Sequence, residues 1–189
     1  MINAENDISI INLIIANAFA RPALFFTGEE MSPKIAKFEC ISAQQWDKDI
    51  KGAEITELTL PQRATKGSAG YDIMALFTID LAPKEALKIP TGLKCKIDDG
   101  WFLGIFPKSG LGFKYHARLG NSVGIIDQDY YNNSNNEGHI WVKLTNDGDK
   151  QLHIDKGKAF CQGIFLPYGI TYDDDAQEIR NGGLGSTEK

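Results

Sequence analysis

Alternating apolar and polar residues in two short segments are the feature that most constrains the fold of this chain. Residues 93–97 and residues 140–144 place an apolar side chain at every second position. A period of two is typical of a β-strand with one buried face. Turn signals at residues 98–100 and 146–148 follow these segments, and residues 101–106 are apolar on both faces. The pattern predicts an all-β domain, built as a sandwich or a barrel.

The length and composition are those of one folded domain with appendages. Of the 189 residues, 42% are hydrophobic and 24% are charged, which argues against a disordered chain. The net charge of -5 gives no support for a nucleic-acid partner, so a polyanionic substrate must meet local cations or a metal. The three cysteines are widely spaced without a CxxC pair, which indicates neither a disulfide framework nor a zinc site and favours a reducing cytoplasm.

Residues 1–30 differ from the rest of the chain, and their function stays unassigned. The apolar run at residues 8–20 suits a short helix, is too short to span a membrane, and follows acidic residues where a secretory signal would have positive charge. Two interpretations stay open, a docking helix or a misassigned start with Met31 as the first residue. We expect the β domain over residues 31–172 and a flexible C-terminal arm over residues 173–189.

Two polar segments in the first part of the domain suit phosphate chemistry, although each also has a plain structural explanation. In residues 68–72, small residues present Asp72 at the start of a strand, and a turn capped by Asp72 would have the same composition. Residues 107–112 place a lysine and a serine beside two glycines, and such a loop can offer amides to phosphate oxygens. A simple turn after a strand looks similar, and the spacing is not that of a Walker loop.

Two later segments are also ambiguous by themselves. Residues 120–130 contain two carboxylates, Asp127 and Asp129, which would share one face of a strand. Burying both is costly without a cation, so at least one should meet solvent or a functional pocket. An exposed acidic strand end and a site both stay open. Residues 180–187 combine one arginine with amides and hydroxyls, which suits either a lid over phosphates or a disordered tail.

Taken in order, these segments resemble the five motifs of the trimeric dUTPase family. The resemblance extends from Ala69 to Thr187 and covers most of the chain after Met31. Its most specific parts are PKSG at residues 107–110, GN at 120–121, GIIDQDY at 124–130 and GGLGST at 182–187. These segments follow the same order as the motifs of the family, so a chance match is a poor explanation of the resemblance.

The resemblance implies a jelly-roll-like β-barrel, assembled as a homotrimer whose active sites each draw motifs from different subunits. It implies hydrolysis of dUTP to dUMP and pyrophosphate, which limits uracil incorporation into DNA and supplies dUMP for thymidylate synthesis. It also implies Mg²⁺ held by the triphosphate and by ordered waters.

The catalytic roles that the resemblance implies fall on three residues. Asp127 resembles the carboxylate that orients and deprotonates the water attacking the α-phosphorus, a general-base role worth roughly 10²- to 10⁴-fold. Asp72 resembles the acid that contacts the metal through water. Gln162 resembles the amide that contacts the phosphates and their waters.

Phosphate contacts are implied for the second and the last motif. Ser109 and Gly110 resemble phosphate ligands, and Lys108 stands where many relatives carry Arg, although a lysine cannot grip two oxygens in a planar fork. Leu184 stands where the family usually has a Phe stacked on uracil, and an aliphatic chain cannot stack as a ring does. The residues of the implied lid are Arg180, Leu184, Gly185, Ser186 and Thr187.

Base and sugar selection are implied for a tight hairpin that includes Asn121. The side chain of Asn121 and the backbone near Gly124 and Ile126 resemble the groups that read the uracil edge. Tyr130 resembles the aromatic residue that packs under the deoxyribose and leaves no room for a 2'-hydroxyl. Residues 131–137 are longer than the turn that many relatives have after this tyrosine, and we expect a protruding loop there.

Two other functions stay open. A dCTP deaminase of similar fold would need a deaminating glutamate and an Arg/Ser-rich phosphate motif, which we do not find in the sequence. A catalytically weak relative could act as a regulatory binding protein through the N-terminal segment or the Asn-rich loop. The intact polar residues of the motifs argue against that second alternative.

Overall fold

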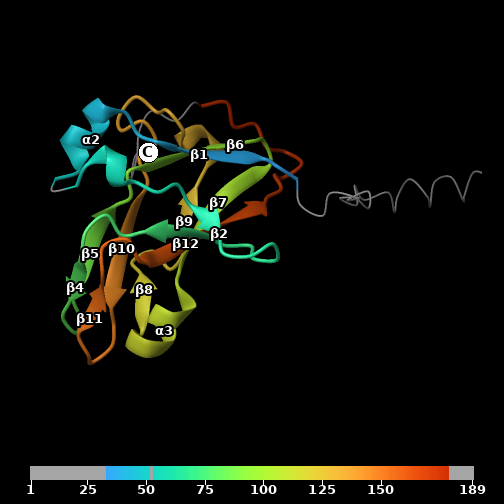
Figure 1. Cartoon of the computed structure of the whole chain (residues 1–189). Helices are drawn as coiled ribbons and strands as arrows, with labels where there is room; N and C mark the ends of the chain where they lie inside the picture. Colours follow the sequence, from blue (N-terminus) through green and yellow to red (C-terminus); the bar gives the residue numbers. More distant parts are fainter. Residues whose placement is uncertain (1–32, 52, 179–189) are drawn as a thin grey trace, which may run out of the picture. The chain divides into compact units, whose positions relative to one another are not determined.

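The computed structural model describes residues 33–51 and 53–178, in which strands dominate (Figure 1). Residue contacts divide the chain after Lys34, and the helices and strands below all belong to the unit that begins at Ile35. The predictions for residues 1–30 and for all five lid residues lie outside the described residues. Within the described ranges, no helix is long and apolar enough to cross a membrane.

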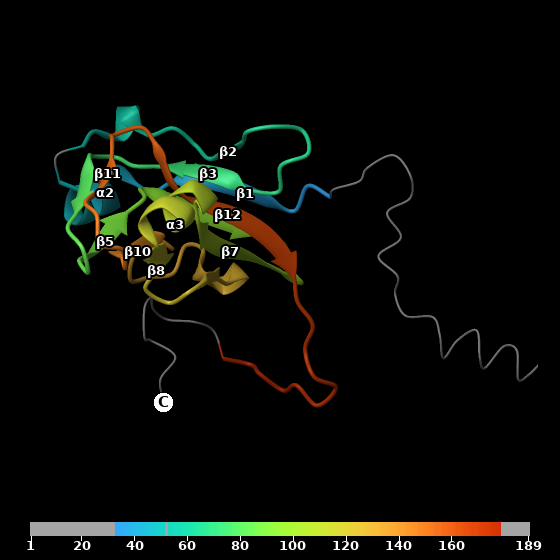
Figure 2. The ribbon, with the colours of Figure 1, turned by 90° about the horizontal axis from the view of Figure 1, so that it is seen from below.

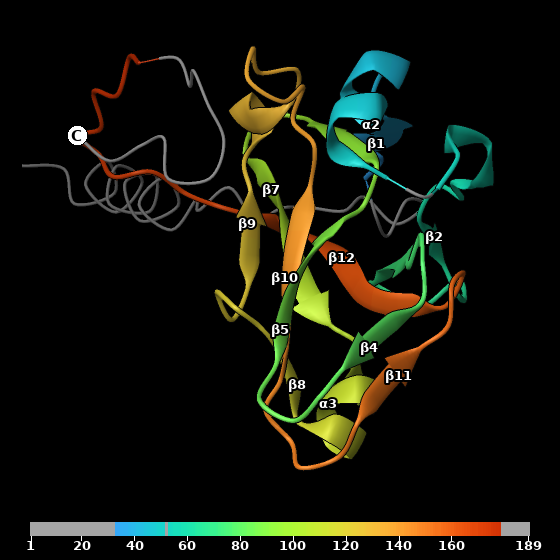
Figure 3. The same ribbon diagram turned by 90° about the vertical axis from the view of Figure 1, so that its left-hand side faces the viewer.

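Short helices and turns interrupt the strands. The helices α2 (Ala43–Asp49) and α3 (Ser109–Tyr115) lie at opposite ends of the sheets (Figure 3). Two 3-10 turns, η1 (Ile55–Glu57) and η2 (Gln128–Tyr130), complete the helical elements of the described residues. The strands are β1 (Ala36–Cys40), β2 (Gln62–Arg63), β3 (Tyr71–Met74), β4 (Ile79–Leu81), β5 (Ala86–Pro90), β6 (Leu93–Ile97), β7 (Trp101–Pro107), β8 (Ala117–Leu119), β9 (Gly124–Ile126), β10 (Trp141–Asn146), β11 (Leu152–Ile154) and β12 (Ala159–Pro167).

The strands pair in an order that differs from their order in the chain. The largest sheet has five strands in the order β2-β3-β12-β7-β9, and a second sheet has three in the order β5-β10-β8. β1 pairs with β6, and β4 pairs with β11. These pairs are antiparallel. The predicted all-β, jelly-roll-like fold is confirmed. After β12, residues 168–178 continue as an exposed arm, drawn in red in Figure 2.

The core follows the alternation seen in the sequence. Leu93, Cys95 and Ile97 of β6 are at most 3% exposed, as are Val142 and Leu144 of β10. These side chains belong to one continuous apolar core. β7 lies between β12 and β9 and has no exposed residue, as the apolar character of residues 101–106 predicted.

The helix α2 was not predicted from the sequence. It begins after Ser42, whose hydroxyl accepts a hydrogen bond from the amide of Gln45 (3.1 Å). Trp46 packs with three aliphatic residues in a small second core, and its indole nitrogen donates to the carbonyl of Ala53 (3.0 Å). A helix of seven residues contains too few apolar positions for its period to be recognised.

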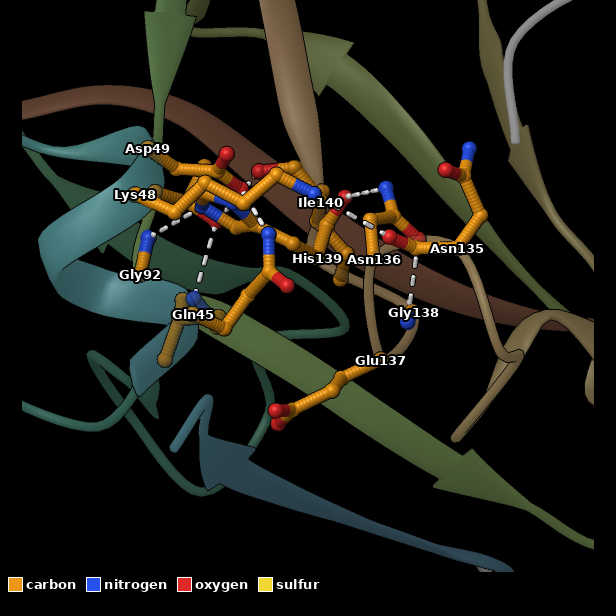
Figure 4. A network of polar contacts seen from close by, with 12 residues as sticks. Gln45, Lys48, Asp49, Gly92, Asn135, Asn136, Glu137, Gly138, His139 and Ile140 are labelled. Carbon is orange, nitrogen blue, oxygen red and sulfur yellow. Dashed lines mark hydrogen bonds and ion pairs between the residues drawn. The ribbon is translucent and has the colours of Figure 1, made fainter. Parts of the chain in front are cut away.

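The Asn-rich loop at residues 131–137 packs against the domain instead of protruding, which corrects our expectation. It folds back on β1 and on the start of α2. Figure 4 shows His139, which follows the loop, in contact with Asp49 at the other end of α2. Glu137 accepts hydrogen bonds from the amide (2.9 Å) and the hydroxyl (2.5 Å) of Ser42. The hydroxyl of Tyr131 donates to Glu39 (2.6 Å). The loop residues therefore have partners about 90 residues earlier in the chain, which local composition cannot reveal.

His139, at the end of this loop, should make the stability of the fold depend on pH. Burial lowers the pKa of His139 below its ordinary value of 6.5, and the nearby Asp49 opposes this shift without outweighing it. The folded ring thus stays neutral where the unfolded chain takes up a proton, so stability is lost as the pH falls below that value. We predict that acidification destabilises the wild type more than His139→Gln, by at most about 1.4 kcal/mol per pH unit. Urea unfolding at about pH 7.5 and about pH 5.5 measures the difference, and equal losses in both proteins would contradict it.

Candidate active site

Residues from three distant segments meet on the five-stranded sheet. Asp72 in β3 lies opposite Gln162 in β12, and β12 also pairs with β7, which ends at Pro107. Lys108 follows directly, and its Nζ lies 2.6 Å from Oδ1 of Asp72. The side-chain amide of Gln162 donates to the carbonyl of Pro107 (3.2 Å). We call Asp72, Lys108 and Gln162 the Asp72 cluster.

The charges of the Asp72 cluster are half-buried. The side chain of Asp72 is 22% exposed and that of Lys108 is 30% exposed. Solvent therefore still screens the ion pair, and such a pair contributes little to stability. A ligand that offers phosphate oxygens to Lys108 can replace the carboxylate as its partner.

The first turn of α3 begins beside the Asp72 cluster, because Lys108 is the N-cap residue of this helix. Ser109 and Gly110 are its first residues, and both are exposed. The first amides of a helix have no acceptor within the helix itself, so the amides of Ser109 and Gly110 can donate to a bound anion. His116 is the C-cap residue of the helix, and its left-handed φ of 53° directs the chain into β8.

Asn121 lies on a connection between two sheets, and Gly124 begins the strand that follows it. The two residues are therefore not in a hairpin of paired strands, which corrects our prediction. β8 pairs with β10 in the three-stranded sheet, whereas β9 pairs with β7 in the five-stranded sheet. The connecting turn includes the exposed Asn121 and Ser122, which has a φ of 63°. In β9, Gly124 lies opposite Ile105, and Ile126 follows two residues later. Each strand takes a partner that is distant in sequence, so local pattern could not show the change of sheet.

Asp127 and Asp129 do not share the face of a strand, contrary to the prediction. β9 ends before Asp127, which is the N-cap residue of η2, and Asp129 lies within that turn. The chain bends here because the amide of Tyr130 donates to the carbonyl of Asp127 (3.2 Å). The side-chain amide of Gln128 donates to Asp99 in the β6–β7 turn (2.5 Å), which attaches η2 to a second segment.

Within one chain, Asp127 lies far from Asp72. Asp72 is level with Phe106 of β7 across the sheet, whereas Asp127 lies one residue beyond the pair of Ile126 with Leu103. The positions of Asp72 and Asp127 thus differ by four residues along the direction of β7, which is about 13 Å. They also differ by three strand spacings across the sheet, which is about 14 Å. The two residues are therefore roughly 20 Å apart. A single water molecule cannot contact both carboxylates.

The donor set of the Asp72 cluster suits Mg²⁺ that is bound mainly by a substrate. In the described part of the chain, no group of three His, Cys, Asp or Glu residues is placed to hold a metal ion. Mg²⁺ prefers oxygen ligands, keeps several waters and usually combines one or two carboxylates with substrate phosphates. The half-buried carboxylate of Asp72, beside the exposed first turn of α3, is compatible with this mode of Mg²⁺ binding.

Comparison with known proteins identifies the family. The sequence model of the dUTPase family matches residues 56–188. A deoxyuridine 5'-triphosphate nucleotidohydrolase from Lactococcus lactis is 44% identical over 146 residues, which are 73% of this chain and 97% of that protein. The crystal structure of a dUTPase from Streptococcus mutans has a TM-score of 0.58 at 34% identity, covering 71% of this chain and 97% of that one. A mutant dUTPase from phage phi11 of S. aureus, described with a structural Mg(II) ion, shares the fold with a TM-score of 0.57 at 19% identity, over 77% of this chain and 98% of that one.

The chain therefore belongs to the dUTPase family. The family match includes the Asp72 cluster, the first turn of α3 and the segment from Asn121 to Tyr130. The resemblance drawn from the motifs is confirmed at the level of the family.

Proposed function

We propose that this chain is a dUTP nucleotidohydrolase, which converts dUTP and water to dUMP and pyrophosphate by attack of water on the α-phosphorus. The observation that carries the proposal is the Asp72 cluster, in which an acid, a cation and an amide meet beside the first turn of α3. These groups suit a triphosphate with its metal. The reaction keeps uracil out of DNA, supplies dUMP for thymidylate synthesis and fits a cytoplasmic nucleotide pool.

The phosphates are bound by groups that the free chain holds close together. Lys108 exchanges the carboxylate of Asp72 for phosphate oxygens, and the amides of Ser109 and Gly110 bind the same oxygens. Asp72 would accept hydrogen bonds from waters of a bound Mg²⁺, and Gln162 would contact the phosphates and their waters. Mg²⁺, when bound, neutralises the charge of the triphosphate. The lid residues, Arg180, Leu184, Gly185, Ser186 and Thr187, are proposed to close over the β- and γ-phosphates.

The segment from Asn121 to Tyr130 is assigned to the uracil, the deoxyribose and the attacking water. β9 is an edge strand of its sheet, so Gly124 and Ile126 lie where a backbone can offer hydrogen-bonding groups on its outer side. With the side chain of Asn121, these groups read the uracil edge. Tyr130 packs under the deoxyribose. Asp127 orients the attacking water toward the phosphorus and takes a proton from that water.

The complete site requires more than one copy of the chain, and we propose a homotrimer. The separation of roughly 20 Å between Asp72 and Asp127 supports this assembly, because both carboxylates must act on one substrate. In the trimer, Asp127 of one copy joins the Asp72 cluster of another. In a closed ring of identical subunits, each subunit makes the same heterologous contact with the next one, so all the shared sites are equivalent.

Gly70 offers a test of how Gln162 is positioned. A Cβ at Gly70 would lie 3.2 Å from Cδ of Gln162 and closer still to Oε1, so a methyl group there must displace the amide. We predict that Gly70→Ala lowers the turnover of dUTP about 10- to 100-fold, because small misplacements of a site residue have effects of that size. Pyrophosphate release measures it. Gly67→Ala is the matched control, since a Cβ there meets nothing within 4 Å, and an equal loss in both variants would contradict the assignment.

The proposed function is tested by a panel of nucleotides with Mg²⁺. We expect purified protein to release pyrophosphate from dUTP far faster than from UTP, dTTP or dCTP. Equal rates on UTP would contradict the role of Tyr130. Release of ammonia from dCTP would favour a deaminase, and tight binding of dUTP without turnover would favour a regulatory protein.

A further inference from the structure

The hydroxyl of Tyr130 is engaged both as a donor and as an acceptor. It donates to the carbonyl of His139 (2.9 Å) and accepts from Nδ2 of Asn136 (2.8 Å). The residue is 8% exposed, so a sugar that packs on the ring meets only a small part of it. The position of that part depends on the groups that hold the hydroxyl.

The carbonyl of His139 is itself held in place, because both nitrogens of its ring are anchored (Figure 4). Nδ1 lies 2.6 Å from Oδ2 of Asp49 in α2, and Nε2 lies 3.0 Å from the amide nitrogen of Gly92. The amide of Gly92 can only donate, so Nε2 accepts and the proton of the neutral ring is on Nδ1, which donates to Asp49. The ring is fully buried, which restricts its movement further.

Asp49 is also restrained. Nε2 of Gln45, one turn earlier in α2, donates to the same Oδ2 (2.6 Å). The amide of Ser42 at the start of the helix donates to Glu137 of the loop (2.9 Å). The loop is thus joined to α2 near both ends of the helix, and none of these contacts involves the Asp72 cluster or Asp127.

We infer that Asp49 and His139 are positioning residues for sugar selection, which fix the ring of Tyr130 through its hydroxyl. The inference rests on the proposed packing of Tyr130 under the deoxyribose. A ring held on an anchored carbonyl cannot retreat to admit a 2'-hydroxyl, whereas a ring on a loose loop can. Binding of dUTP requires no such retreat. The contacts of Asp49 and His139 therefore lower mainly the kcat/KM for UTP and leave that for dUTP nearly unchanged.

The test compares kcat/KM for dUTP and for UTP in Asp49→Ala, which removes the anchor of His139 without altering Tyr130. We expect the preference for dUTP to fall about tenfold, the effect of losing one hydrogen-bonded restraint, mainly through a gain on UTP. Asp47→Ala changes an exposed acid of the same helix and should keep the wild-type preference. Asp49→Asn retains an oxygen that can accept from Nδ1 of His139, and it should restore most of the preference.

Tyr130→Phe removes only the hydroxyl, and it tests the same inference if Asp49→Ala does not fold. The same fall in preference is expected. An unchanged preference in either folded variant would overturn the inference even if the melting temperature dropped, because a purely structural role lowers stability alone. Failure of the proposed function is distinguishable, since the wild type itself would then not hydrolyse dUTP.

Discussion

Asp127→Asn is expected to lower the turnover of dUTP roughly 10²- to 10⁴-fold while binding and assembly change little. An amide has nearly the size and shape of a carboxylate, but it cannot take a proton from the attacking water. Asp127 also lies at the start of a surface turn and outside the continuous apolar core, so the fold should tolerate the change. Pyrophosphate release measures turnover, and calorimetric titration with dUTP measures binding.

Asp129→Asn is the matched control for this prediction. Asp129 is exposed, lies two residues away in the same turn and carries the same charge. Its substitution should leave turnover within a few fold of the wild type. If Asp129→Asn lost as much activity as Asp127→Asn, the effect would come from the local charge rather than from a specific base. Full turnover in Asp127→Asn would mean that another group accepts the proton.

The strands could be predicted because their signal is local. Leu93, Cys95 and Ile97 face the core at every second position, and that pattern is contained in five consecutive residues. The pairing of the strands is a different matter. β12 lies between β3 and β7, and β8 and β9 lie in different sheets, so the arrangement depends on contacts between residues that are far apart in sequence. The jelly-roll-like fold came from the resemblance, not from periodicity.

The site was predictable in its residues and less so in its geometry. Asp72, Lys108 and Gln162 were singled out by motif, and the structure brings them together. The expected strand through Asp127 and Asp129 was wrong, because the amide of Tyr130 closes a turn at that point. The turn is also held by the hydrogen bond from Gln128 to Asp99, 29 residues earlier in the chain, and local composition cannot reveal that contact.

The sequence did not predict the contacts of Asp49 and His139 that hold the hydroxyl of Tyr130. Asp49 lies in a helix too short to recognise, and His139 is a single histidine next to a strand. Their contact spans 90 residues of the chain. The sequence predicted a protruding loop at residues 131–137 for the same reason, since its own composition does not show its contacts with α2.

Mixing two inactive variants is expected to restore activity, because Asp72 and Asp127 of one site come from different copies of the chain. Asp72→Asn and Asp127→Asn should each be nearly inactive alone. When equal amounts are unfolded and refolded together, each site draws the two acids independently. One half of the sites have an intact Asp72, and one half of those meet an intact Asp127, so about one quarter of the wild-type activity should return.

The control for the mixing experiment is the same pair of variants combined without unfolding, in which copies do not exchange and activity should stay low. A catalytic site contained in one chain gives a different result, since every chain in the mixture lacks one acid and no activity can return. Within one chain, Asp72 and Asp127 lie roughly 20 Å apart, which is too far for both to act at the same point of one substrate. Recovery after refolding would therefore show both that the site is shared and that these two carboxylates belong to it.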